Sequence, residues 1–411
     1  NTDPYTNNDL NAILDENATN LRNVIGAANY DIGHVFGTEG GGLAGLGVVC
    51  GSAKEKGATG LSSPIGDFFD VVYVGHEIGH QFGAPHTYNK CQDFGVSSVA
   101  YEPGSGTTIM GYAGLCGSDN VSGSTDYFFH SGSYDIIIAE SDACAVLQAT
   151  GNSAPVVSIS SPANATIPIS TPFTLKGSAT DADGHNLFYT WDQMDVGPSS
   201  PLGTPTGTAP LFRFRPPSSS PERTFPQITN VINNSSNITE VLPTTSRSIN
   251  FRLVARDMQV GGGGVDYASY TMSSTDQAGP FLVEVPNTNV TWLVGATELV
   301  TWDVANTNAA PVNCSHVNIL LSTDGGLTYP VTLASNVPNN GAANITVPDE
   351  AGTNNRVRVE AADNVFFDIS NADFTIEQPV TPSFTMVPEM PEVSICGFSD
   401  AEYRFNLTAL S

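Results

Sequence analysis

The chain has 411 residues, a formal net charge of −27 and a hydrophobic content of 40%. This length predicts two to four domains, and the hydrophobic fraction argues against a disordered chain. An acidic surface with only four lysines argues against nucleic acid or an anionic membrane as partner, and no apolar run reaches the roughly eighteen residues of a transmembrane helix.

The first fifty residues predict one helix and two strands. Apolar residues at helical spacing, among them Leu10, Ile13 and Leu21, predict an amphipathic helix over residues 9–28. Residues 30–36 and the glycine-rich run 41–50 are typical of strands. His34 lies on the first strand, where a packed histidine is more common than a ligand. Residues 1–5 do not read as a signal peptide, so we expect a mature protein or a fragment.

A strongly apolar run, residues 68–74, leads into the most informative segment of the chain. This run predicts that the following helix crosses a domain core. Residues 76–86 then read H-E-x-x-H-x-x-G-x-x-H. Four-residue spacing places His76 and His80 on one helix face, where both can ligate one metal, and Glu77 projects beside that metal as a general base. Gly83 allows the chain to turn, so that His86 becomes the third ligand. Three ligands leave a fourth position for water, which indicates a catalytic zinc site.

A second motif follows at residues 107–112, which read Thr-Thr-Ile-Met-Gly-Tyr. Together with the long histidine motif, it resembles the metzincin clan of zinc metalloproteases, in which a methionine-containing turn passes beneath the histidines. Met110 matches that methionine. Tyr112 matches a tyrosine that in some metzincins binds zinc or stabilises the transition state, and a merely packed tyrosine is an equal alternative.

Within the clan, residues 9–148 are similar to secreted bacterial reprolysin-like proteases, on the runs 47–51, 56–60 and 101–106. One departure is Thr87, because animal reprolysins have aspartate after the third histidine; threonine there is similar to the pappalysin-like branch. The resemblance implies that the strand over 41–50 binds extended substrate by main-chain pairing. It also implies that residues 113–130 shape the pocket for the substrate residue that follows the scissile bond. Phe128 and Phe129 are candidates to line this pocket, and packing in the core is the alternative for both.

The stretch before the zinc motif is shorter than metzincins usually have. Only seventy-five residues precede His76, so the first strands and helix of the upper subdomain are missing from this chain. We expect an upstream segment or a separate chain to complete the sheet, because a half sheet would expose unpaired edges.

Six cysteines accompany these motifs. Four of them lie near a histidine-only zinc site, which indicates disulfides and an oxidising compartment. Cys91 and Cys116 bracket the segment that leads to Met110, so we favour the pairs Cys91–Cys116 and Cys50–Cys144, although four cysteines allow three pairings. We expect the remaining two to be unpaired; these are Cys314 and Cys396.

After residue 150 the composition changes to short alternating strands and frequent turns. Asn152 to Pro155 is typical of a linker, and residues 151–278 predict an Ig-like or PKD-like β-sandwich. Residues 180–191 resemble the acidic turn and strand of cadherin-like and PKD-like modules, so Asp181 and Asp183 are candidate calcium ligands, with an Asx-type turn as the alternative. The Pro/Ser-rich stretch 198–225 predicts a surface insertion. Residues 279–379 predict a second Ig-like sandwich, and residues 380–411 a further β-module or tail.

The sequence therefore predicts an α+β metzincin-like domain over residues 1–150, partial at its N-terminus, followed by all-β sandwiches. The expected function is a secreted or cell-surface zinc metalloendopeptidase acting on proteins or peptides, with zinc as cofactor and calcium as a candidate ion. The alternative is an adhesive or structural surface protein that carries a vestigial protease domain.

Overall fold

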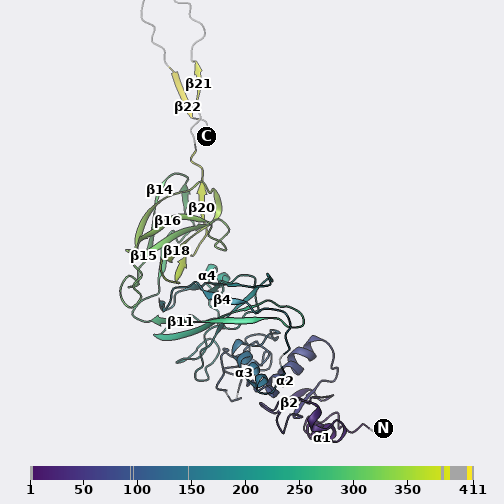
Figure 1. The fold of residues 1–411 in the computed structure, drawn as a ribbon. Coiled ribbons are helices and arrows are strands. Elements are labelled where there is room, and N and C mark those ends of the chain that lie inside the picture. The colour runs from purple at the N-terminus through teal and green to yellow at the C-terminus, as the bar shows by residue number, and fades with distance from the viewer. Residues whose placement is uncertain are drawn as a thin grey trace, which may run out of the picture.

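A computed structural model describes residues 3–92, 94–95, 97–146 and 148–380, and the backbone of 384–388 and 405–409. Figure 1 shows a helix-containing region at the N-terminal end and β-sheet layers beyond it. Within the described residues, no helix combines the length and apolarity needed to cross a membrane.

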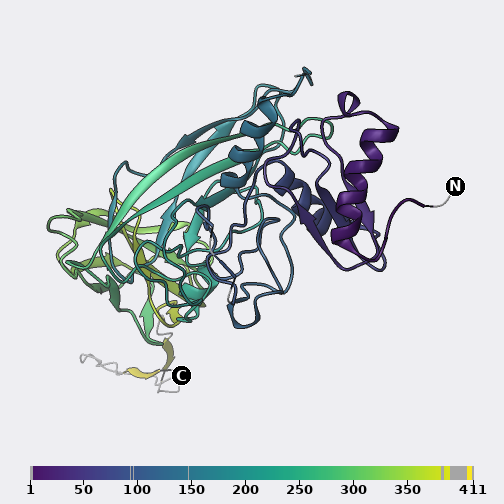
Figure 2. The same cartoon turned by 90° about the horizontal axis from the view of Figure 1, so that it is seen from below.

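The N-terminal region begins with a helix packed on a small sheet. Helix α1 spans Leu10–Val24 and is capped by the Asp9 carboxylate. The sheet contains β1 (Val35–Gly37), β2 (Gly41–Ala44) and β3 (Gly57–Gly60), with β3 in the middle, β1 parallel to it and β2 antiparallel at the edge. Leu10 and Ile13 pack on Val35 and Ala58, and Figure 2 shows α1 beside this sheet.

The expected boundaries of these elements were too wide. The helix predicted over 9–28 ends at Val24, and the strands predicted over 30–36 and 41–50 shrink to β1 and β2. After β2 the chain turns at Gly47, whose φ of 61° favours glycine. Main-chain hydrogen bonds to His80 and Gln81 then hold residues 47–49 away from the sheet.

A π-helix, η2 (Phe68–Val74), runs directly into α2 (Gly75–Gln81). The helix that was expected to cross a core is α2, and four of its seven residues are buried: His76, Glu77, Gly79 and Gln81. Of the apolar run before it, only Phe69 is buried. Phe68, Val72 and Tyr73 line an open cleft instead. The other helices of this region are η1 (Ala27–Asn29), which follows α1, and η3 (Gly117–Asp119) and α3 (Ser131–Asp142), which follow α2. His130 caps α3 through its Nδ1.

The first sandwich has one four-stranded sheet, ordered β5-β11-β10-β8, and the strand pairs β4–β7 and β6–β9. Alternate residues of β10, including Ile249, Phe251 and Leu253, are fully buried, as expected for a strand with one face on a core. The bounds are β4 Val156–Ile159, β5 Thr166–Pro168, β6 Phe173–Leu175, β7 Gly177–Thr180, β8 Phe188–Gln193, β9 Arg223–Phe225, α4 Ile228–Ile232, β10 Arg247–Arg256 and β11 Val265–Thr275.

The prediction of a surface insertion over residues 198–225 is wrong in part. Leu211, Phe212 and Phe225 of this stretch are buried in the sandwich core. Their burial is favourable because each aromatic ring removes a large apolar area from water. The prolines and serines around them hid this apolar content in the sequence.

The second sandwich has a three-stranded sheet, β12-β14-β17, and a larger sheet ordered β13-β20-β18-β15-β16, with β19 paired to β18. The bounds are β12 Leu282–Val285, β13 Thr291–Leu293, β14 Thr297–Asp303, β15 His316–Ser322, β16 Val331–Pro338, β17 Ala342–Thr346, β18 Gly352–Ala361, β19 Phe367–Ile369 and β20 Phe374–Glu377. Beyond it, β21 (Phe384–Pro388) pairs with β22 (Phe405–Ala409).

The two sandwiches share one hydrophobic core. Main-chain hydrogen bonds join them, from Thr174 N to Val365 O at 2.9 Å and from Phe367 N to Pro172 O at 3.0 Å. Phe173 of β6 and Phe366 also form an isolated β-bridge. The junction between the two sandwiches therefore has the buried apolar packing and main-chain hydrogen bonding of a domain interior.

The N-terminal region contacts the first sandwich through paired charges. Arg252 of β10 lies 2.6 Å from Asp135 of α3, and Arg213 lies 3.3 Å from Asp126. Both views show α3 against the long strands of this sandwich. These contacts hold the segment from Asp126 to Asp135, which follows the Met110 turn in the sequence.

Candidate metal centre

Three histidines converge at the C-terminal end of α2. His76 and His80 lie one helical turn apart, and the positive φ of Gly83, 86°, turns the chain so that His86 returns to them. The Nε2 atom of His86 lies 3.2 Å from Nε2 of His76 and 3.1 Å from Nε2 of His80. The structure thus brings together the three histidines that the sequence motif singled out.

The opposite ring nitrogens show which atoms are free to bind a metal. His76 Nδ1 lies 2.6 Å from the carbonyl oxygen of Ile109, and His80 Nδ1 lies 2.8 Å from that of Ala84. A carbonyl oxygen only accepts, so both Nδ1 atoms carry the proton and both Nε2 atoms present a lone pair. Nitrogen lone pairs that face each other at these distances are stabilised by a cation between them.

The spacing of the nitrogens fits zinc. In a tetrahedral site with zinc–nitrogen distances of about 2.1 Å, the ligand atoms lie about 3.4 Å apart. The measured separations of 3.1 and 3.2 Å are close to that value. Histidine-only coordination with one position left free is also the donor set of catalytic zinc.

Burial keeps the three imidazoles neutral, which is the form that binds metals. Burial, and then the nearby His80, lowers the pKa of His76 to about 4. Burial, followed by the charges of His76 and His80, lowers the pKa of His86 to about 3, and burial also lowers the pKa of His80. At neutral pH no proton therefore competes for the converging nitrogens.

Glu77 lies beside the histidines, against the edge strand β2. A β-carbon added to Gly42 would come well within 3.0 Å of the Glu77 carboxyl group. Only glycine leaves room for the carboxylate between α2 and the strand. Burial raises the pKa of Glu77 to about 7, which lies in the range that suits a general base.

Met110 and Tyr112 both lie close to the three histidines. Met110 is fully buried, and its Sδ atom lies 2.6 Å from where a β-carbon on Gly79 would be, directly under α2. The Tyr112 ring centroid lies 4.4 Å from that of His86. Burial, and then the charges of Tyr88 and Glu77, raises the pKa of Tyr112 to about 12, so its hydroxyl keeps its proton.

A cleft of about 660 Å³ opens beside Glu77, His76 and Tyr112. Residues of segment 113–127 form one wall of this cleft, whereas Phe128 and Phe129 do not line it. Phe129 packs on Gly79 instead, and Phe128 lies near Phe214. The large apolar and aromatic side chains of the lining include Phe68, Val72, Tyr73, Phe94, Leu115 and Tyr127.

Glu102 is the residue near the site that sequence reasoning missed. Its side chain is buried, and its carboxylate accepts hydrogen bonds from the hydroxyl groups of Thr87 and Thr108, each at 2.5 Å. The backbone N–H groups of Thr107 and Thr108 donate to its other oxygen at 2.8 and 3.2 Å. Glu102 therefore ties the residue after the third histidine to the start of the methionine turn. Its run of residues was noted in the sequence, but no local signal marked the carboxylate.

His34 behaves as a packed histidine. Its ring nitrogens lie 2.7 Å from Gln81 Oε1 and 2.8 Å from Thr59 Oγ1, and burial lowers its pKa. Gln81 also donates to the Gly33 carbonyl at 3.0 Å. These bonds fasten the end of α2 to the sheet.

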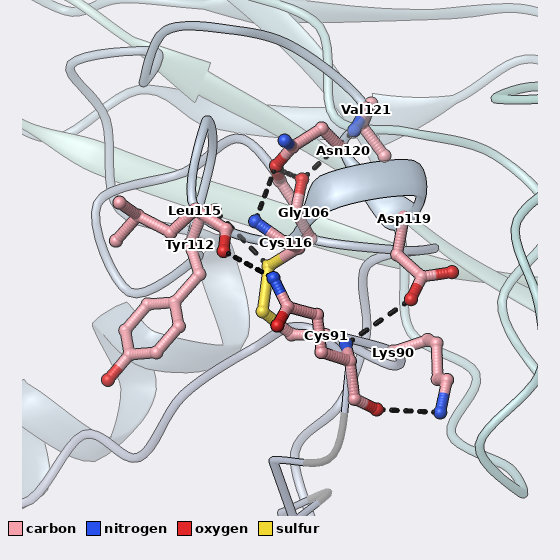
Figure 3. The surroundings of a disulfide bond; sticks show 11 residues. Lys90, Cys91, Gly106, Tyr112, Leu115, Cys116, Asp119, Asn120 and Val121 are labelled. Atoms are coloured by element: carbon pink, nitrogen blue, oxygen red, sulfur yellow. Dashed lines mark hydrogen bonds between the residues drawn. A yellow bond between two sulfur atoms is a disulfide. The ribbon is translucent and has the colours of Figure 1, made fainter.

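Two disulfides brace the site, Cys50–Cys144 and Cys91–Cys116, the pairs favoured above. Figure 3 shows Cys91–Cys116 behind Tyr112, with the Tyr112 hydroxyl directed away from the sulfur atoms. Cys314 is free and buried, whereas Cys396 lies outside the described residues.

The candidate calcium ligands are not brought together as expected. Asp181 groups with His185 and Asp257. Asp183 lies outside this group, and its Oδ2 accepts a hydrogen bond from Ser153 N at 2.7 Å.

Part of the chain is similar to a known protein family. Residues 1–87 match the model of the reprolysin-like metallopeptidases of family M12B. No curated protein matches the chain. Similar solved structures include the tandem Ig repeats of Dlar, with 15% identity over 55% of this chain and 98% of that one and a TM-score of 0.28. The ICAM-5 D1–D4 ectodomain fragment has 15% identity over 57% and 56% and a TM-score of 0.20.

A Bacteroides ovatus protein, SGBP-B of the mixed-linkage glucan utilization locus, has 12% identity over 55% of this chain and 48% of that one, with a TM-score of 0.15. Residues 1–87 are thus similar to the reprolysin-like metallopeptidases of family M12B, and the residues after 150 form β-sheets packed as sandwiches.

Proposed function

We propose that this chain is a secreted zinc-dependent endopeptidase that hydrolyses peptide bonds in proteins. The observation that carries the proposal is the convergence of the Nε2 atoms of His76, His80 and His86 beside an open cleft that also contains Glu77. A zinc ion bound by these nitrogens would polarise the scissile carbonyl and acidify a water molecule.

Glu77 would accept the proton of the attacking water and pass it to the leaving amine. The carboxylate lies against Gly42, and both residues line the cleft. Strand β2 pairs with β3 and occupies the edge of the sheet, so its outer side can pair with an extended substrate. Tyr112, protonated beside His86, would donate a hydrogen bond to the developing oxyanion.

The cleft also supports a substrate preference. Its walls combine Phe68, Tyr73 and Tyr127 with aliphatic side chains, and such a lining favours an apolar residue after the scissile bond. The disulfides support an extracellular location. The domain boundaries 150/151, 278/279 and 379/380 and a place near the pappalysin-like branch are further parts of this proposal.

The test is the Glu77→Gln variant, analysed for metal and for cleavage of casein. We expect one zinc per chain in wild type and variant, and cleavage only by the wild type, stopped by a chelator. A wild-type chain that binds zinc without cleaving any protein would overturn the proposal in favour of an adhesive surface protein with a vestigial protease domain.

A further inference from the structure

A second group of metal-binding side chains lies far from the histidines, where the linker enters the first sandwich. Asp181 follows β7, and Asp257 follows β10. His185 completes the group, and the ligand atoms of the three residues lie within 4.8 Å of one another.

Three polar atoms around this group are buried and lack any hydrogen-bond partner: Asp181 Oδ2, His185 Nδ1 and Asn152 Oδ1. The Asp181 side chain is only 2% exposed. Its other oxygen is satisfied, since it accepts from the backbone N–H groups of Asp183 and His185 at 2.8 and 3.1 Å. A buried polar atom without a hydrogen-bond partner costs on the order of a few kcal/mol, so three such atoms in one place indicate a shared partner.

Protonated His185 does not supply that partner. Its Nδ1 lies 3.6 Å from Asp181 Oδ1, which is too long for a hydrogen bond. A ring proton at Nδ1 would moreover leave Asp181 Oδ2 and Asn152 Oδ1 unpaired.

The surrounding loops hold these side chains in place. Asn152 Nδ2 donates to Asp257 Oδ2 at 2.6 Å and to the Gly262 carbonyl at 3.0 Å, which fixes its amide so that Oδ1 is the free acceptor. Asp257 Oδ1 accepts from Gly264 N at 2.9 Å. A β-carbon on Gly264 would lie 2.7 Å from Ala154 Cα, so the glycine loop is pressed on the linker. The donors are therefore preorganised.

We propose that Asp181, Asp257 and His185 bind a divalent cation, with Asn152 Oδ1 as a neighbouring oxygen donor. Two carboxylates balance the double positive charge. Oxygen donors suit Ca²⁺, and the added imidazole nitrogen suits Mn²⁺ or Zn²⁺. The ion would join the linker at Asn152 to the ends of β7 and β10, and so fix the direction in which the chain leaves α3. This inference does not depend on the proposed protease activity.

The test is calorimetric titration of the zinc-loaded full chain with Ca²⁺, Mn²⁺ and Zn²⁺ in separate runs. Because the histidines are already filled, we expect one further ion per chain and a higher thermal midpoint in its presence. Asp181→Asn keeps the oxygen that accepts from the turn and should weaken binding at least about tenfold, since affinity follows ligand charge.

Asp183→Asn is the matched control, because this neighbouring carboxylate lies outside the group, and it should bind like wild type. His185→Ala distinguishes the ions, because it should weaken the binding of Mn²⁺ and Zn²⁺ much more than the binding of Ca²⁺, which prefers oxygen ligands. A wild-type chain that takes up no further ion, or an Asp181→Asn chain that binds as tightly as wild type, overturns the proposal.

Discussion

The carboxylate of Glu102 accepts a 2.5 Å hydrogen bond from the hydroxyl group of Thr87, the residue that follows the third histidine. The same carboxylate accepts from the backbone at Thr107 and Thr108. Thr87 is therefore hydrogen-bonded to a carboxylate supplied 15 residues later in the chain. Thr87 departs from the animal reprolysin pattern without leaving the methionine turn unsupported.

The first prediction concerns this support. Glu102→Gln replaces one accepting oxygen by a donor that faces other donors, so we expect a loss of about 2–4 kcal/mol in unfolding free energy. We also expect a fall of about tenfold or more in kcat, with KM little changed, because the histidine geometry loosens. Urea unfolding and steady-state cleavage measure both. Glu284→Gln, on an exposed position of β12, is the control and should change neither.

The second prediction tests the contact between Gly42 and Glu77. In Gly42→Ala the new β-carbon collides with the carboxylate, so Glu77 must swing away from the cleft. Cleavage should fall about a hundredfold, within the range that general base catalysis contributes, while zinc content stays at the wild-type value. Gly40→Ala is a close control, because a β-carbon there meets nothing within 4 Å. Equal activity in both variants would show that the contact has no role.

The third prediction is a pH dependence of stability from Glu55. The Arg22 guanidinium, 2.9 Å away, and then the Tyr30 hydroxyl hold the pKa of Glu55 at about 2, against the effect of burial. A pKa lowered by folding gives stability that is complete above the ordinary pKa of about 4.5 and is lost as pH falls towards 2. Wild type should lose on the order of 3 kcal/mol of this pair's contribution over that interval.

Urea unfolding of wild type and Glu55→Gln between pH 6 and pH 2.5 measures the effect. The two curves should converge at the acidic end, whereas Glu350→Gln, an exposed position, should follow wild type throughout. A constant gap between wild type and Glu55→Gln would contradict the lowered pKa.

The fourth prediction concerns the contact between α3 and the first sandwich. Arg252 and Asp135 lie 2.6 Å apart, and the Arg252 guanidinium also covers the Tyr267 ring. A double-mutant cycle with Arg252→Gln and Asp135→Asn should give a coupling of about 1 kcal/mol, since both side chains are partly exposed. Zero coupling would mean that the pair does not help to hold α3.

The sequence predicted the parts of the site whose residues are close in the chain. His76, His80 and His86 lie within eleven residues, so helical spacing and one glycine turn determine how they meet. Other pairs meet only because separate segments of the chain pack together, namely Gly42 with Glu77 and Thr87 with Glu102. No periodicity in the sequence reveals such pairs. The buried aromatics of stretch 198–225 were missed for a related reason: prolines and serines dominate its composition, whereas Phe212 and Phe225 determine where it lies.

The shared core of the two sandwiches has a mechanical consequence. Rotating one sandwich against the other would break the main-chain hydrogen bonds at Thr174 and Phe367 and expose Phe173 and Phe366, which are fully buried. The pair must therefore turn as a single rigid arm. Since α3 is bound to the first sandwich, the orientation of this arm also determines the orientation of the cleft. A surface that binds the second sandwich would therefore orient the cleft as well.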